Sequence, residues 1–101
     1  MSNEVSTNFT GSSQTGSAFE LKGHFNLSIS GTISAGSITI QRSKDNSTWN
    51  DVDTFTSTTE TYGFDPHRMF YRAVSSGDFS GDCDVVLFKE QDFHAKSVVL
   101  Y

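Results

Sequence analysis

Histidine and acidic side chains are the first groups in this sequence that could do chemistry, because they could hold a metal ion. Three histidines occur, His24, His67 and His94, and Asp65 stands two residues before His67. The histidines lie far apart in the sequence, and no pair of them has the spacing of a zinc motif. We therefore expect them to be structural or surface side chains.

A second acidic group contains Asp78, Asp82 and Asp84, which could offer oxygen ligands to calcium. The alternating acids, central glycine and terminal glutamate of an EF-hand loop are absent from this stretch. We therefore expect a solvated loop here, and neither a metal nor another cofactor is predicted for the chain.

Paired carboxylates beside an aromatic ring could indicate sugar chemistry. Asp51 and Asp53 share one face of an expected strand with Trp49. The two carboxylates of a glycosidase usually come from separate elements that flank a cleft, about 5–10 Å apart, and a small sandwich offers no obvious cleft. The chain also lacks the G-x-S-x-G elbow that activates a serine nucleophile in one class of hydrolases. The sequence therefore predicts a protein that is not an enzyme.

Length and composition limit the remaining function classes. The chain has 101 residues, a formal net charge of −5 and one cysteine, Cys83. One domain with one modest core is expected at this length. The acidic balance disfavours nucleic acid as a partner, and a lone cysteine allows no internal disulfide, which suits a reducing cytoplasm. We expect neither a membrane span nor a signal peptide, because no stretch has the required apolar length.

Short runs in which apolar and polar residues alternate predict an antiparallel all-β domain over residues 18–89. In the clearest run, Phe25, Leu27 and Ile29 alternate with polar residues. Asp65 and Pro66 are expected to end a strand, because proline has no N–H to donate to the ladder. About seven strands at this spacing are typical of a β-sandwich. The expected strands are 18–22, 24–30, 37–43, 49–55, 59–64, 69–74 and 83–88. The predicted core contains Phe25, Leu27, Ile29, Ile38, Ile40, Trp49, Tyr71, Val85 and Leu87.

The two ends of the chain, residues 1–17 and 90–101, are expected to form an extended N-terminal arm and a C-terminal tail outside this domain. The N-terminal stretch is rich in serine and threonine, so by itself it buries too little surface to offset its ordering entropy. The C-terminal stretch ends in four apolar side chains that the sandwich does not obviously need. We therefore expect partner proteins to order both ends. The expected partner-binding residues are Val5, Phe9, Phe93, Val98, Val99, Leu100 and Tyr101.

Several local motifs between residues 19 and 89 carry a resemblance to a known group of proteins. They are the F-x-L-x-G start at 19–23, a glycine turn at 31–36, a Q-R-S hairpin ending in tryptophan at 38–49, a T-E-x-x-G-x-x-P corner at 59–66, and a Y-R strand at 71–72. With them the chain resembles small tailed-phage virion proteins with immunoglobulin-like or jelly-roll-like β-sandwiches. The resemblance implies a structural building block of the virion that is made in the host cytoplasm. No catalytic residues carry over from it.

Two functions from different classes are compatible with this resemblance, and the apolar residues in the two ends of the chain favour the first, because a subunit that holds others together needs contacts beyond its compact domain. The first is a capsid decoration or cement subunit, a homo-oligomer or multi-copy protein that binds other virion proteins, above all the major capsid protein, through its sandwich and its arms. The second is a tail, baseplate or head-exposed module that recognises host surface glycans through exposed aromatic rings such as Trp49, Tyr62 or Phe79. The shared motifs do not decide between head, neck and tail.

Overall fold

The computed structural model describes residues 4–89. This part of the chain is built from β-strands and contains no helix. It therefore contains no helix that could cross a membrane. The all-β fold expected from the alternating pattern is confirmed. The strands are β1 (Glu4–Phe9), β2 (Phe19–Ala35), β3 (Ile38–Ser43), β4 (Asn50–Phe55), β5 (Thr59–Ser75) and β6 (Ser80–Lys89).

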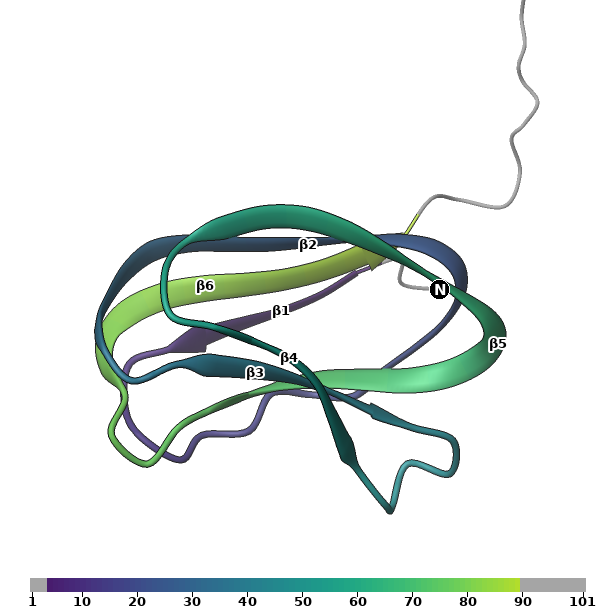
Figure 1. Ribbon diagram of the computed structural model, residues 1–101, viewed down its shortest axis with the longest axis horizontal. Helices are drawn as coiled ribbons and strands as arrows, with labels where there is room; N and C mark the ends of the chain where they lie inside the picture. The colour runs from purple at the N-terminus through teal and green to yellow at the C-terminus, as the bar shows by residue number, and fades with distance from the viewer. Residues whose placement is uncertain (1–3, 90–101) are drawn as a thin grey trace, which may run out of the picture.

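The six strands form one antiparallel sheet that folds over into two layers (Figure 1). The strand order is β1-β6-β2-β5-β3-β4. One layer contains β1, β6, most of β2 and the first half of β5, while the other contains the second half of β5 with β3 and β4. The two long strands, β2 and β5, therefore run through both layers of the sandwich.

The sheet bends where β2 and β5 pass from one layer to the other. Leu21 pairs with Met69 and Gly23 pairs with Asp65, so the register shifts between these two pairs. Gly23 has a φ of 92°, a conformation that glycine adopts without the strain that a side chain would cause. Pro66 lies within the irregular stretch, where it has no ladder hydrogen bond to donate. Asp65 and Pro66 therefore bend β5 and do not end it, in contrast to the expectation from the sequence.

This bend explains why fewer and longer strands are found than the sequence pattern indicated. Apart from Ala18, the expected strands 18–22 and 24–30 both lie in β2, and 59–64 and 69–74 both lie in β5. The two-residue alternation is interrupted at each bend, and an interrupted alternation looks like a strand end in the sequence.

The N-terminal segment also differs from the expected arm, because the structure places its residues in the sandwich. β1 pairs with β6 along its whole length, and the Phe9 side chain is fully buried. Residues 13–16 then continue beside the second half of β5, where the Gly16 N–H donates to the Ala73 carbonyl oxygen at 2.8 Å. Backbone pairing with two neighbouring strands thus orders a segment whose composition is mostly polar. The sheet begins at Glu4, before the domain start expected at Ala18.

The core fills the space between the two layers. Its buried members are Phe9, Phe19, Leu21, Leu27, Ile29, Ile38, Ile40, Tyr71, Ala73, Phe79, Cys83, Val85 and Leu87. All the predicted core residues except Trp49 belong to this cluster or, as Phe25 does, pack against it. Trp49 precedes β4 and is only half-buried; the guanidinium carbon of Arg72 lies 4.2 Å from the centroid of its ring system. This stacking on Arg72 accounts for the partial burial of Trp49 away from the core.

Candidate functional site

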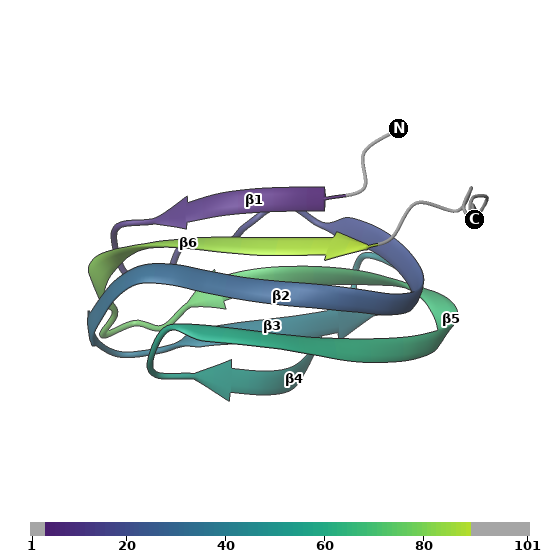
Figure 2. The ribbon, with the colours of Figure 1, turned by 90° about the horizontal axis from the view of Figure 1, so that it is seen from above.

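In the described part of the chain, the two layers of the sandwich are closed on one side and open on the other. β1 and residues 13–16 lie on the closed side, and β4 lies at the opposite side of the molecule (Figure 2). Within residues 4–89, β4 pairs only with β3, and residues 59–65 of β5 pair only with β2. These two strand edges frame the open side.

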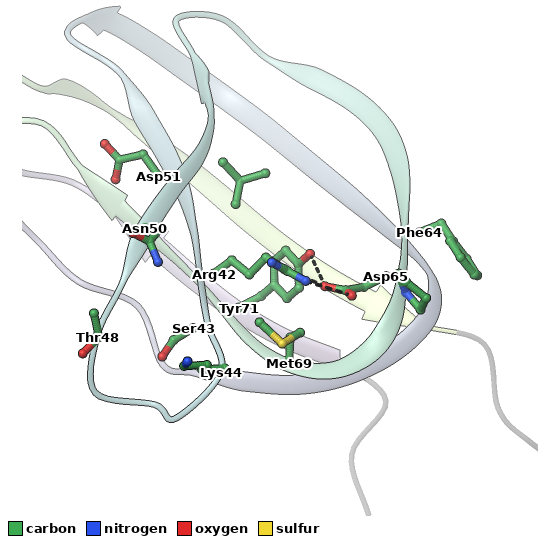
Figure 3. A pocket seen from close by; sticks show the side chains of 12 residues that line it. Arg42, Ser43, Lys44, Thr48, Asn50, Asp51, Phe64, Asp65, Met69 and Tyr71 are labelled. Atoms are coloured by element: carbon green, nitrogen blue, oxygen red, sulfur yellow. Dashed lines mark hydrogen bonds and ion pairs between the residues drawn. The ribbon is translucent and has the colours of Figure 1, made fainter.

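A hollow of about 610 Å³ lies on this open side (Figure 3). Its lining comes from β3, β4, β5 and the loop between β3 and β4, and it includes Arg42, Val52, Asp65 and Met69. A smaller hollow of about 140 Å³ adjoins it and shares Val52 and Tyr71 with the first. The lining therefore changes from charged groups beside the bend to apolar groups farther along β4.

The charged end of the hollow is organised by one buried carboxylate, Asp65, which is 2% exposed. Arg42 donates to it from Nε at 2.7 Å and from Nη2 at 3.1 Å, and the Tyr71 hydroxyl donates at 2.8 Å. The backbone N–H of His67 adds a fourth hydrogen bond at 3.1 Å. Figure 3 shows Arg42 and Tyr71 converging on this carboxylate. Four donors satisfy both oxygens of Asp65.

This network fixes the protonation of its members. The hydrogen bond from Arg42 is the main cause that lowers the pKa of Asp65 to about 2, against the opposing effect of burial. Burial, followed by the hydrogen bond to Asp65, raises the pKa of Tyr71 to about 12. Around neutral pH the carboxyl group is ionised and the phenol is protonated. Such a pair is suited to holding the bend of β5 in place, and poorly suited to exchanging protons with a substrate.

Exposed apolar side chains gather on the two strands that frame the open side. Among the described residues, the large hydrophobic side chains that are exposed are Val52 (52%), Tyr62 (79%) and Phe64 (59%). Val52 belongs to β4, and the two aromatic residues belong to the first half of β5. Phe64 is one of the residues that line the hollow (Figure 3), and its ring lies against His24, with 4.7 Å between the ring centroids.

Tyr62 and Phe64 belong to an ordered array on the outer face of the sandwich. Cross-strand neighbours share a face of the sheet, and so do residues two apart on one strand. Three neighbouring pairs of β2 and β5 therefore form one surface, which we call the aromatic face: Ser28 with Glu60, Asn26 with Tyr62, and His24 with Phe64. The Ser28 hydroxyl donates a hydrogen bond to the Glu60 carboxylate. The aromatic face thus combines two exposed rings with hydroxyl, amide, carboxylate and imidazole groups.

The histidines considered for metal binding have other neighbours in the structure. His24 packs on Phe64, and His67 contributes its backbone N–H to Asp65. His94 lies outside the described residues. Over residues 4–89, no three or more histidine, cysteine or acidic side chains come together in a way that could hold a metal ion.

The acids considered for calcium are engaged in hydrogen bonds with polar side chains. The Asn8 amide donates to one carboxylate oxygen of Asp82 and one of Asp84, each at 2.9 Å. Asp78 accepts a hydrogen bond from the Ser76 hydroxyl at 2.7 Å. Asp78 is thus held in the loop before β6, while the other two acids lie on the strand and bind β1 through Asn8.

The expectation that Asp51 and Asp53 share one face of the strand is wrong, because a β-bulge lies between them. Asp51 pairs with Gln41 and Asp53 pairs with Ile40, so one extra residue, Val52, stands between the two pairs. Gln41 and Ile40 are consecutive on β3 and face opposite sides of the sheet. Asp53 therefore lies on the core side of β4, whereas Asp51 accepts a hydrogen bond from Gln41 at 2.9 Å on the other side.

The residues predicted to bind partners are divided between the core and the part of the chain beyond residue 89. Val5 is half-buried against the core and Phe9 lies inside it, so Phe9 has no surface left for a partner. The other five, Phe93, Val98, Val99, Leu100 and Tyr101, lie outside the described residues.

The aromatic residues proposed for glycan contact differ in their exposure. Phe79 is buried and Trp49 stacks on Arg72, whereas Tyr62 is exposed. Phe64 was not singled out from the sequence, although alternation placed it on the same face as Tyr62.

No protein-family model, curated protein or solved structure matches this chain. The candidate site is therefore defined by geometry alone, as an aromatic face beside an open strand edge.

Proposed function

We propose that this protein is a non-enzymatic structural subunit of a tailed-phage particle, most specifically a capsid decoration or cement protein that docks through its aromatic face. The observation that carries the proposal is the exposure of Tyr62 and Phe64, which lie two residues apart on the same face of β5. Apolar side chains that gather into one exposed patch can mark a site of association, and aromatic side chains are enriched among the residues that dominate binding energy in interfaces. The sheet fixes the backbone that carries both rings, and the Phe64 ring packs on His24, which lowers the ordering cost of binding.

Three further features support a structural role. The motifs at residues 19–89 resemble those of small phage virion proteins, as described above. Asp65, the carboxyl group whose pKa is lowered to about 2, accepts hydrogen bonds from Arg42, Tyr71 and the backbone N–H of His67. The net charge of −5 favours a neutral or basic protein surface over a nucleic acid as the partner.

The proposal is tested by adding purified subunits back to particles that lack them and measuring the number bound per particle. Tyr62→Ser and Phe64→Ser should each lower the affinity for particles by about tenfold or more, because each removes a ring from the centre of the contact. Val52→Ser serves as the matched control, since Val52 is also exposed but lies on β4, away from the aromatic face. Undiminished binding of both aromatic variants, with folding verified by circular dichroism, would overturn this mode of attachment.

A second candidate function is recognition of host glycans, and the composition of the same face favours it. Sugar rings stack on exposed aromatic rings, while Asn26, Glu60 and His24 could bind their hydroxyl groups. Particles depleted of the subunit distinguish the two functions. Loss of resistance to heat or mechanical stress supports the cement role, whereas intact particles that adsorb poorly to host cells support glycan recognition.

A further inference from the structure

The surface that carries the aromatic face continues across β2 onto β6. Asn26 pairs with Tyr62 of β5 on one side and with Phe88 of β6 on the other, so the half-buried Phe88 lies on the same surface. Val86, two residues before Phe88, lies on it as well. Figure 2 shows β6, β2 and β5 side by side. This outer surface of the layer therefore presents apolar side chains on its two flanking strands and polar side chains on β2 between them.

Acidic side chains occupy one end of this surface. Glu60 lies two residues before Tyr62 on β5, and Asp84 and Asp82 precede Phe88 on β6. All three acids are exposed, and all three lie on the same side of the row that joins Tyr62 to Phe88. Measured along the strands, Glu60 is about 7 Å from that row and Asp84 is about 14 Å from it.

Neutral groups hold these three carboxylates in place. The Asn8 amide donates to one oxygen of Asp82 and to one oxygen of Asp84. The Ser28 hydroxyl donates to one oxygen of Glu60. Each carboxylate keeps a second oxygen that accepts no hydrogen bond from residues 4–89, and no lysine or arginine in this range forms an ion pair with any of the three. The sheet thus positions the acids without neutralising them, and a partner's positive charge can reach them.

Positive charge lies at the opposite end of the surface, where the sheet bends. Lys22 and Arg68 are exposed in the stretch where the register of β2 and β5 shifts. The charge therefore changes sign along the strands. Such a surface favours one docking orientation, because the reverse orientation places like charges together. A partner is expected to place its own positive charge over the end that carries Glu60 and Asp84.

Arginine matches both the rings and the carboxylates of this surface. Its planar guanidinium stacks on aromatic rings and binds a carboxylate through two parallel hydrogen bonds, whereas lysine offers only a compact charge. Tyr62 and Glu60 offer a ring and a carboxylate on one face of β5. The same acids would repel a nucleic acid or an anionic membrane. Within residues 4–89 no three acidic, histidine or cysteine side chains converge as metal ligands, so the pattern favours a protein over a metal ion.

We propose that the partner of the aromatic face is a protein surface that carries arginine side chains, which stack on Tyr62 and pair with Glu60, Asp84 and Asp82. This inference rests on the proposed function, in which the aromatic face is the docking surface, and it identifies the chemistry of the partner at that surface. Charge pairs of this kind speed the encounter and select its orientation, while the rings stabilise the bound state. Binding is therefore expected to depend on salt as well as on the rings.

Binding of purified subunits to particles that lack them, measured at about 50 and about 300 mM NaCl, tests the proposal. The variant Glu60→Gln/Asp82→Asn/Asp84→Asn removes three charges from the surface. The matched control, Asp51→Asn/Asp53→Asn/Asp78→Asn, removes three exposed charges from β4 and from the loop before β6. Both variants change the net charge equally, so a difference between them reports on position.

We expect the unmodified subunit and the control to lose about tenfold or more in affinity at the higher salt concentration. The acid variant should bind about tenfold more weakly at the lower salt concentration and depend little on salt. Glu60→Gln alone leaves the hydrogen bonds of Asn8 intact and should change binding in the same direction by a smaller factor. It replaces the triple variant if circular dichroism shows that the triple variant does not fold.

Chemical modification of the particles identifies the side chain that the partner provides. Phenylglyoxal blocks arginine and acetic anhydride blocks lysine, and electron microscopy verifies that the treated particles remain intact. We expect phenylglyoxal to lower the affinity of the unmodified subunit by about tenfold or more, and acetylation to lower it by less than about threefold. A larger loss after acetylation would overturn the assignment to arginine.

The aromatic variants separate failure of this inference from failure of the proposed function. If Tyr62→Ser and Phe64→Ser weaken binding while the acid variant equals its control at both salt concentrations, the docking surface is supported and the arginine partner is wrong. An uncharged partner, such as a neutral glycan, then fits the result. If neither the aromatic variants nor the acid variant changes binding, the aromatic face is not the docking surface and both proposals are wrong.

Discussion

The Tyr71 hydroxyl donates a hydrogen bond of 2.8 Å to the Asp65 carboxylate across the bend of β5. Tyr71 belongs to the core of the second layer, whereas Asp65 still pairs with β2 in the first. The same carboxylate binds Arg42 of β3. One ionised side chain therefore connects the two layers at the point where the sheet folds over.

Asp65→Asn should destabilise the protein by about 2–4 kcal/mol, because an amide cannot accept the charge-assisted pair of bonds from Arg42. The partial exposure of Arg42, 37% for its side chain, keeps the loss below that of a fully buried ion pair. Chemical denaturation measures the free energy of unfolding. Asp53→Asn is the control; Asp53 is exposed and accepts a hydrogen bond from the Thr54 N–H, so a change within about 0.5 kcal/mol is expected.

Stability should fall in acid in a way that depends on Asp65. The pKa of this group is lowered from 3.8 to about 2 on folding, so its contribution is fully present above pH 3.8. The contribution is lost as the pH falls towards 2, because the unfolded chain takes up the proton first. Unfolding measured between pH 6 and pH 2 should show a shallower loss for Asp65→Asn than for the unmodified protein. Identical slopes would mean that other carboxyl groups cause the acid sensitivity.

Stability should also fall in alkali because of Tyr71. Folding raises the pKa of its phenol from 10.0 to about 12, so the stabilisation is present below pH 10 and disappears as the pH rises towards 12. Tyr71→Phe removes the titrating hydroxyl and should flatten this decline, at the cost of one hydrogen bond to Asp65. Thermal melts at pH 9, 10 and 11 test the difference, and Tyr62→Phe is the matched control because Tyr62 is exposed.

Phe9→Ala should cost about 3–5 kcal/mol, as expected for removal of a buried aromatic side chain. Deletion of residues 1–12 should likewise lower the melting temperature, because it removes β1 and exposes the edge of β6. Both outcomes oppose the behaviour of a free arm, whose loss would change the melting temperature little. Val52→Ala, at an exposed apolar position, provides the control for the loss of side-chain volume.

The sequence predicts those parts of the fold in which the local pattern is regular. Leu27 and Ile29 alternate with polar neighbours, and both are buried as expected. β1 was missed because a single large side chain, Phe9, anchors an otherwise polar strand whose order comes from pairing with β6. That pairing joins residues at opposite ends of the chain, and composition carries no trace of it.

The candidate site was less predictable because distant residues build it. Asp65 was considered as a turn residue and beside His67 as a metal ligand, but its main partner, Arg42, lies in a different strand. The bulge at Val52 reverses the face of Asp51 relative to Asp53, and a strict two-residue alternation cannot indicate such a reversal. The grouping of Tyr62 with Phe64 does follow from alternation, but their exposure depends on the layer of the sheet to which this half of β5 belongs.

The pairing of β1 with β6 also constrains how the protein is made. β1, the first described strand in chain order, needs the last described strand as its neighbour, from Glu4 opposite Phe88 to Phe9 opposite Cys83. Synthesis adds about 5–20 residues per second. Phe9 therefore cannot be buried against β6 until β6 has emerged from the ribosome. The sheet can be completed only after residues 80–89 have been made, so β1 stays without its neighbouring strand while the 70 residues between β1 and β6 are synthesised.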